Sequence, residues 1–296
     1  MSATRYIIPG EDIANTPMLK LVRANRQAGT LWQEFNAWLT SVSPQTRAEF
    51  SDGGRQVLLR ASLPSEPPTD EWALQYADAI HNFRAALDGL AWEVAHLDGA
   101  KPTSSAARSL YFPLAKSADR WATVVQQTLR SVPPDVLERI RSVQPFMART
   151  EGEIPTVLLH ELDRADKHRS SLSVRLTGRD RQTLALMTKF DPSVDRRTDP
   201  LLWDFYEFLA DGVELHDGVP VARLRAKVPF VDVSIETLPL RLDTEVSSIK
   251  YDAFLLLRAI DRHVTGTFMT VLLGGLVRDW ADYVVHGAPR PTTPWI

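Results

Sequence analysis

The spacing of apolar residues changes twice along this chain, and no other feature limits its possible folds as much. After Thr16-Pro17, apolar residues recur every three or four positions, as an amphipathic helix requires. Between residues 170 and 243 they alternate with polar neighbours, for example at Leu172, Val174 and Leu176, which is typical of strands. Helical spacing returns from about residue 244. We therefore predict an α+β fold, in which a helical bundle holds an inserted, mainly antiparallel β-sheet.

These changes predict four parts of the chain. Residues 1–169 form the first part of the bundle, 170–243 the inserted sheet, 244–286 the C-terminal helices that complete the bundle, and 287–296 a proline-rich tail. The expected helices of the bundle cover residues 16–39, 69–98, 117–130, 134–142, 153–169 and 245–285, the last with a break near Thr265-Gly266. Within the sheet we expect a short aromatic helix at residues 201–209 and a turn at Asp217-Gly218.

Composition excludes several classes of protein. The chain has no cysteine, and therefore no disulfide, thiolate zinc site, iron–sulfur cluster or cysteine nucleophile. Its 34 Lys and Arg residues against 37 Asp and Glu give a net charge of −3, which argues against nucleic-acid binding through overall charge but allows a local basic patch. The longest run without a full charge, from Arg262 to Arg278, is too short to span a bilayer, and we see no secretory signal. We expect a cytoplasmic protein.

Polar side chains lie along the apolar stripe of the helix expected at residues 69–97. With Ile80 at the centre of that stripe, Arg84 falls inside its edge, at about 40°. Asp88 and His81 follow on the same flank, at about 80° and 100°. An imidazole, a guanidinium and a carboxylate therefore share one side of the helix.

The helix expected at residues 153–169 has the same property. With Leu158 at the centre, Arg169 falls at about 20° and Asp166 at about 80°, both toward the core, while His168 lies on the opposite flank. An isolated buried charge is costly, so these residues need partners. We predict pairs across the helix interface, Arg84 with Asp166 and Arg169 with Asp88.

Two interpretations of this cluster stay open. In the first, it is a structural network of ion pairs that fixes the register of the helices. In the second, His81, Asn82 and His168 line a polar pocket beside the ion pairs. Histidine exchanges protons near neutral pH, and arginine holds phosphate through a bidentate fork. The second interpretation suits acid–base chemistry on a phosphodiester or the binding of an anionic ligand.

The motifs of these two helices resemble those of a known family. The segment HNFRAALDGLAW at 81–92 is followed by LHELDRADKHR at 159–169, with Phe112-Pro113 and Gln144-Pro145-Phe146 between them. This arrangement resembles an uncharacterised bacterial family with an HN-x-R-x-ALD-x-LAW helix and a later DKHR motif. The resemblance covers roughly residues 70–176 and implies no established activity.

A weaker likeness is to HEPN domains, which are all-helical bundles. Many of them are metal-independent RNases with an Arg followed, after four to six residues, by a His, and their sites are usually completed at a dimer interface. The likeness assigns these parts to Arg164 and His168, which three residues separate, one fewer than in the HEPN pattern. His160 lies on the same helix face. The likeness implies RNA cleavage without metal, and a homodimer.

Other kinds of site have less support. Asp78-x-x-His81 and Glu93-x-x-His96 have the spacing of metal ligands, but they lie too far apart on one helix to share a metal cluster. Neither a G-x-S-x-G motif nor a glycine-rich phosphate loop is present.

Two further features bear on ligand binding. Residues 164–181 contain six Lys or Arg residues and only two Asp residues. This positive cluster is able to guide a nucleic acid or nucleotide. We place Trp72 and Trp121 in cores, whereas Trp92 falls past His81 on the polar flank of its helix.

We therefore predict a HEPN-like cytoplasmic protein with a site between helices 70–97 and 153–169, acting as a metal-independent RNase or as a phosphate- or anion-binding module. The candidate catalytic residues are His81, Arg84, Asp88, Arg164 and His168, and the candidate binding residues are Asn82, Asp166, Lys167 and Arg169. The expected partner is RNA or a nucleotide, with no cofactor and no metal. The alternative is a non-catalytic binding or assembly protein, in which the same cluster is a structural ion-pair network.

Overall fold

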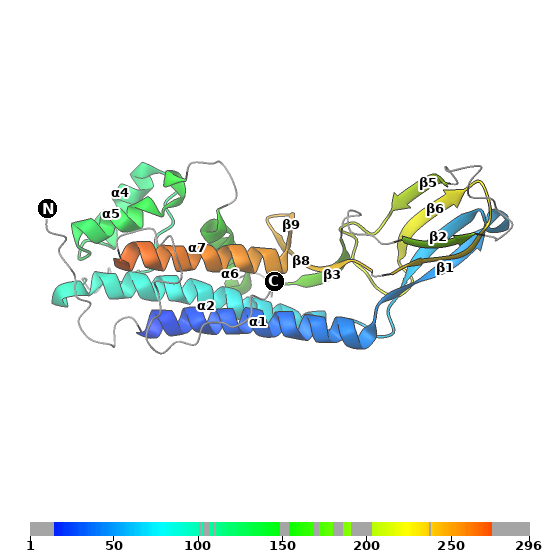
Figure 1. The fold of residues 1–296 in the computed structure, drawn as a ribbon. Coiled ribbons are helices and arrows are strands. Elements are labelled where there is room, and N and C mark those ends of the chain that lie inside the picture. Colours follow the sequence, from blue (N-terminus) through cyan, green and yellow to red (C-terminus); the bar gives the residue numbers. More distant parts are fainter. Residues whose placement is uncertain are drawn as a thin grey trace. The chain divides into compact units, whose positions relative to one another are not determined.

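The computed structural model describes residues 15–100, 102, 107–108, 110–148, 154–168, 172–179, 186–190, 203–236 and 238–273. The fold is α+β, as the changes in hydrophobic period predict (Figure 1). The helices are α1 (Asn15–Val42), α2 (Thr69–Ala95), α4 (Ala118–Gln127), α5 (Pro134–Ser142), α6 (Pro155–His168) and α7 (Ala253–Leu273), with short 3-10 turns η1 (Asp52–Gly54), η2 (Leu97–Gly99) and η3 (Pro145–Met147). The strands are β1 (Gln45–Ser51), β2 (Gln56–Ser62), β3 (Val174–Gly178), β4 (Leu186–Phe190), β5 (Trp203–Phe208), β6 (Pro220–Ala226), β7 (Phe230–Ile235), β8 (Leu240–Val246) and β9 (Ile249–Asp252).

The chain divides into two compact units. A helical unit combines Met1–Thr30, Leu74–Leu172 and Phe254–Ile296, and a sheet unit combines Leu31–Ala73 and Ser173–Ala253. Both units are therefore assembled from segments that are distant in the sequence.

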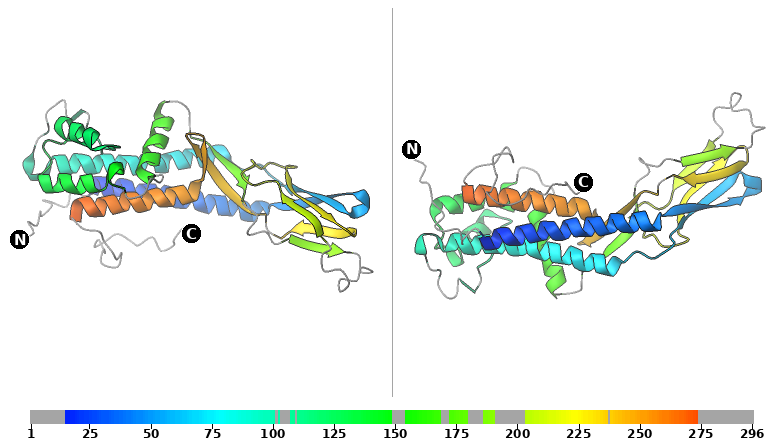
Figure 2. Two further views of the ribbon diagram at one scale, coloured as in Figure 1. Left: turned by 90° about the horizontal axis from the view of Figure 1, so that it is seen from above. Right: turned by 60° about the horizontal axis from the view of Figure 1, so that its bottom comes forward.

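The helical unit buries the apolar stripes that the sequence predicts. Helices α1, α2 and α7 run side by side, and α6 crosses α2 (Figures 1 and 2). The core residues that these helices contribute include Leu21, Ala24, Ala28, Ile80, Phe83, Leu87, Ala91, Leu159, Leu162, Ile260, Val264 and Phe268. Two side-chain hydrogen bonds connect α1 to neighbouring helices. Asn25 on α1 donates to Asp261 on α7 at 2.8 Å, and Asn82 on α2 donates to Gln27 on α1 at 2.9 Å.

The sheet unit contains three sheets whose paired strands are all antiparallel among the described residues. One has the strand order β1-β2-β6-β5, one has the order β3-β8-β9, and the third pairs β4 with β7. Strand β2 shows the alternation typical of a half-buried strand, because Val57, Leu59 and Ala61 are buried while their neighbours are partly exposed.

The structure corrects three of the predicted elements. Residues 203–208 of the predicted aromatic helix form strand β5, because aromatic side chains favour a half-buried pleated surface and β6 offers a free edge. The helix expected from 245 begins only at Ala253, because β8 and β9 occupy the preceding residues. Helix α7 also continues without a break through Gly266. The tail at 287–296 lies outside the described residues.

In the described part of the chain, no helix combines the length and the apolar character that a membrane span needs.

Burial makes Asp261 a source of pH-dependent stability. Burial raises the pKa of this carboxyl, although hydrogen bonds from Asn25 and Thr265 act in the opposite direction. A carboxyl with a raised folded-state pKa contributes stability below its unfolded pKa, and this contribution is lost as the pH rises through the folded pKa. Asp261→Asn keeps an acceptor for Asn25 and removes the charge. We expect this variant to raise the thermal midpoint by a few degrees at pH 7, and to have almost no effect near pH 3.

Thermal denaturation followed by circular dichroism at both pH values measures this difference. Glu66→Gln, at an exposed loop position, is the control and should leave the midpoint unchanged. A lower midpoint for Asp261→Asn at pH 7 would show that the ionised carboxylate stabilises the helices.

Candidate functional site

Helices α2 and α6 bring an imidazole and a carboxylate together. His81 Nδ1 lies 3.3 Å from Asp163 Oδ1, and Lys167 Nζ donates to Asp163 Oδ2 at 2.8 Å. A carboxylate can only accept, so His81 Nδ1 carries the hydrogen and Nε2 is left for another partner. Asp163 is 6% exposed, whereas the His81 side chain is 48% exposed. A buried carboxylate therefore orients an imidazole that solvent can reach.

A second pair, Arg84 with Asp88, lies deeper in the same unit. Arg84 is 4% exposed, and its Nη2 lies 2.8 Å from Asp88 Oδ1, one helical turn further along α2. Arg84 Nη2 also donates to the carbonyl oxygen of Phe112 at 2.9 Å, and the Phe112 amide donates to Asp88 Oδ1 at 2.9 Å. The two side chains together satisfy both backbone groups of Phe112 and hold the segment before α4 against α2.

Burial dominates the electrostatics of this pair. Desolvation raises the pKa of the Asp88 carboxyl, and the attraction of Arg84 and the hydrogen bonds from Phe112 and Arg84 offset it only in part. A weaker contribution from the negative charge of Asp163 also raises the pKa of Asp88.

His160 is a second imidazole in this region. Its pKa is lowered, first by desolvation and then by the positive charges of Arg84 and Arg164. Asp163 and Asp88 act in the opposite direction. His160 therefore lies among the charged residues of α2 and α6, in the first half of α6.

The structure separates the predicted site residues into three groups. Arg84 and Asn82 are buried and Asp88 is partly exposed, and all three are bonded within the fold, with Asn82 also donating to the Asp78 carbonyl at 2.9 Å. His81, Arg164 and Lys167 have exposed side chains. Asp166 is partly exposed and forms no ion pair with any residue in the described ranges.

One predicted ion pair is wrong, and the other lies outside the described residues. Arg84 pairs with Asp88 on its own helix instead of with Asp166, because the spacing of four residues places their side chains one above the other. Arg169 and the side chain of His168 are not among the described residues, so neither the Arg169–Asp88 pair nor a role of His168 is described.

Sequence reasoning missed Asp163 because the centre of the α6 stripe was misplaced by one residue. The fully buried residues of this helix are Leu159 and Leu162, whereas Leu158 is partly exposed. With Leu159 at the centre, Asp163 falls at about 40°, inside the buried face. The signal in the sequence was the i, i+3 and i+4 set of Leu159, Leu162 and Asp163.

The tryptophans lie where the sequence predicts. Trp72 and Trp121 are buried, whereas Trp92 is 44% exposed and packs against His96 in a tilted arrangement, with the ring centroids 4.3 Å apart. Among the described residues, no group of three or more His, Asp or Glu side chains is arranged to hold a metal ion.

The predicted basic cluster is divided between the two units. Arg164 and Lys167 belong to α6, whereas Arg175 belongs to β3 and lies 3.7 Å from Glu214. Among the described residues of this cluster, Arg164 and Lys167 lie on the helix that carries Asp163, the partner of His81.

Comparison with known proteins found no match: no family model, no curated protein and no solved structure is similar to this chain. The function has to be argued from the geometry of the site.

Proposed function

We propose that the helical unit is a metal-independent ribonuclease that acts in the cytoplasm. The observation that carries the proposal is the His81–Asp163 pair, in which a buried carboxylate holds one nitrogen of a half-exposed imidazole. An acid or base that is itself oriented by a third group is the common arrangement for activated proton transfer. Arg164 and Lys167 on the adjoining helix supply positive charge for a phosphate.

The two imidazoles suit the two proton transfers of RNA cleavage. His160 has a lowered pKa and is therefore neutral at pH 7, so it is assigned as the base that removes the proton of a ribose 2′-hydroxyl. The 2′-oxygen attacks phosphorus, and the bond from phosphorus to the 5′-oxygen breaks. His81, in its doubly protonated form, donates the Nε2 proton to that leaving oxygen and keeps the Nδ1 hydrogen on Asp163. The products are a 2′,3′-cyclic phosphate and a free 5′-hydroxyl.

The proposal changes the parts assigned to two predicted catalytic residues. Arg84 and Asp88 act as positioning residues, because Arg84 is almost fully buried and both bind the Phe112 backbone. The helical composition of this unit is compatible with the likeness to HEPN nucleases. By the same likeness, the proposal includes a homodimer.

The burial of Arg84 and Asn82 favours a second candidate function. Both side chains bond only within the fold, as expected of a bundle whose ion pairs and amide bonds fix helix register. In that case the protein is a non-catalytic binding or assembly module. The two candidates differ in one result, because the second requires purified protein to leave RNA intact.

The lowered pKa of His160 predicts the pH dependence of cleavage. Because a base acts in its neutral form, a base of lowered pKa stays active below the ordinary histidine value of about 6.5. We expect the acid limb of kcat/KM for a single-stranded RNA oligonucleotide, measured with EDTA present, to lie below pH 6.5. Arg164→Gln removes one of the charges that lower this pKa, and should move the acid limb toward higher pH.

Glu138→Gln, on α5, provides a comparison for the pH profile. Glu138 is exposed and pairs with Arg141 on its own helix at 2.9 Å, so its variant should keep the wild-type acid limb. An acid limb above pH 6.5 in the wild type would contradict the assignment of His160 as the base.

A further inference from the structure

The backbone that precedes α4 is fixed to the helical unit at two points. At the first, the Phe112 amide donates to Asp88 Oδ1, and Arg84 Nη2 donates to the Phe112 carbonyl, both at 2.9 Å. At the second, the Ala115 amide donates to Gln144 Oε1, also at 2.9 Å. Phe112 and Ala115 are both buried. The chain between these two residues is therefore held in one position.

The two fixed points explain a pair of motifs that lie between the site helices in the sequence. Phe112-Pro113 contains the first point, and Gln144-Pro145-Phe146 forms the second, because the Phe146 amide also donates to the Ala115 carbonyl, at 3.4 Å. The Gln144 side chain is itself held, since its nitrogen donates to the Ile140 carbonyl at 3.1 Å. Both motifs thus serve to fix the same short segment of backbone.

Tyr111 stands at the start of this fixed segment and points away from the core. It is 54% exposed, more than any other Phe, Trp or Tyr in the described ranges, and it forms no hydrogen bond or ring contact with the described residues. Trp92, the other exposed aromatic residue of the helical unit, already packs against His96. Tyr111 therefore offers an open aromatic face on a fixed backbone, which lowers the entropy lost when a ligand binds.

The segment that carries Tyr111 lies between the two helices of the proposed ribonuclease site. Phe112, the next residue, is bonded to α2. At the other end of the segment, Lys116 Nζ lies 4.0 Å from Glu161 Oε1 on α6. Glu161 directly follows His160, the proposed base. The segment thus extends from α2 to the part of α6 at which the reacting ribose is expected.

We propose that Tyr111 stacks on a base of single-stranded RNA, beside the nucleotide that is cleaved. This inference rests on the ribonuclease function proposed above and specifies the form of its substrate. Every base has a π face, so stacking on Tyr111 accepts many sequences but requires a base that is not paired in a duplex. The buried bonds of Arg84 and Asp88 to Phe112 then serve substrate binding, because they fix the position of the neighbouring ring.

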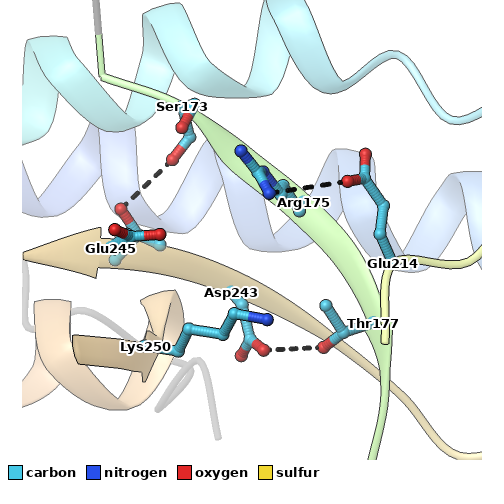
Figure 3. Close-up of a pocket in the computed structure, with 8 residues that line it drawn as sticks. Ser173, Arg175, Thr177, Glu214, Asp243, Glu245 and Lys250 are labelled. Atoms are coloured by element: carbon cyan, nitrogen blue, oxygen red, sulfur yellow. Dashed lines mark hydrogen bonds and ion pairs between the residues drawn. The ribbon is translucent and has the colours of Figure 1, made fainter. Parts of the chain in front are cut away.

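A polar pocket in the sheet unit is unsuited to this role. It lies on the β3-β8-β9 sheet, where Thr177 donates to Asp243 and Arg175 lies beside Glu214 (Figure 3). Its volume of about 20 Å³ has room for about one water molecule and not for a base.

Binding is measured with full-length His81→Ala, which should hold RNA without cleaving it. A fluorescein-labelled single-stranded RNA octamer is titrated in EDTA, and fluorescence anisotropy gives the Kd. Adding Tyr111→Ala should raise this Kd by roughly 5- to 150-fold, the range for the loss of one base–aromatic stack. Tyr111→Phe keeps the ring and should leave the Kd unchanged. An abasic octamer has the same phosphates and no bases, so Tyr111→Ala should not alter its Kd.

Phe205→Ala is the matched control, because Phe205 is 44% exposed and belongs to the sheet unit. It should leave the Kd unchanged. The inference is overturned if His81→Ala does not bind the octamer, or if Tyr111→Ala binds it as tightly as Tyr111→Phe does. It is also overturned if Phe205→Ala, or the abasic octamer with Tyr111→Ala, shows the same loss.

The same proteins separate this inference from the ribonuclease proposal. Cleavage by the wild type, together with a Kd that does not depend on Tyr111, would keep the ribonuclease and remove the stacking. Binding that depends on both Tyr111 and the bases, without cleavage by the wild type, would keep the stacking and remove the ribonuclease.

Discussion

Asp88→Ala is expected to lower the free energy of unfolding of the helical unit by about 3–5 kcal/mol, because it leaves Arg84 buried without its counter-charge. Arg84 is 4% exposed, and the same change removes the acceptor of the Phe112 amide. Equilibrium unfolding in urea, followed by circular dichroism, measures the difference.

Asp135→Ala is a matched control for this variant. Asp135 pairs with Arg139 at 2.9 Å and with the same spacing of four residues, but the Asp135 side chain is 42% exposed, and Arg139 also donates to the carbonyl oxygen of Val271. Exposed pairs of this kind contribute under about 1 kcal/mol. The double variant Arg84→Met with Asp88→Asn removes both charges while keeping an acceptor for Phe112, so it should lose less stability than Asp88→Ala alone. Equal losses for Asp88→Ala and Asp135→Ala would show that Arg84 does not depend on its buried partner.

The architecture could be predicted from the sequence because hydrophobic period reports directly on burial. Residues 134–142 form α5 with the predicted bounds, since Pro134 starts the helix and Val136 and Ile140 give it a buried face. The fold class follows from the change to alternation after residue 170. Both signals are local, and the tertiary structure does not overrule them.

The elements that could not be predicted depend on pairing between distant segments. Strand β5 forms because β6 lies beside it, and the bulge at Asp204 shifts the register between Trp203 and Phe205. Strand β9 likewise exists only as the partner of β8. The sequence alone does not show which segments lie side by side. Short segments that are rich in aromatic residues, or that mix polar and apolar residues, are therefore ambiguous between helix and strand.

The site was predicted only in part, because its residues were assigned from their angles around the helical wheels of α2 and α6. The wheel of α2 correctly placed Arg84 inside the buried stripe and His81 at an exposed flank. On α6, a centre displaced by one residue hid Asp163, which falls at about 140° from Leu158 but at about 40° from Leu159. The acceptor of His81 was therefore missed. The predicted partner of Arg84 was wrong for another reason, because Arg84 pairs with Asp88 within α2.

His81→Ala is expected to reduce RNA cleavage by about 10²–10⁴-fold while leaving the fold intact. The side chain is half exposed, so its removal creates no cavity, and Asp163 keeps Lys167 as a partner. Asp163→Asn should also reduce cleavage, because the neutral amide orients the imidazole less strongly. Initial rates on a labelled single-stranded RNA in EDTA give both values.

His216→Ala controls for loss of an exposed histidine. His216 lies in the sheet unit and should cleave RNA like the wild type when replaced. Circular dichroism of each variant establishes that the fold is retained. A His81→Ala protein with wild-type rates would remove His81 from the mechanism.

The most direct test of the account is the analysis of cleavage products from wild-type protein and His81→Ala, incubated with single-stranded RNA in the presence of EDTA. Mass spectrometry distinguishes a 2′,3′-cyclic phosphate from other ends. The account predicts fragments with cyclic phosphate and free 5′-hydroxyl ends from the wild type, and intact RNA from His81→Ala over the same period. Intact RNA in both reactions, across several RNA sequences, would contradict a ribonuclease and leave the binding or assembly module as the function of this cluster.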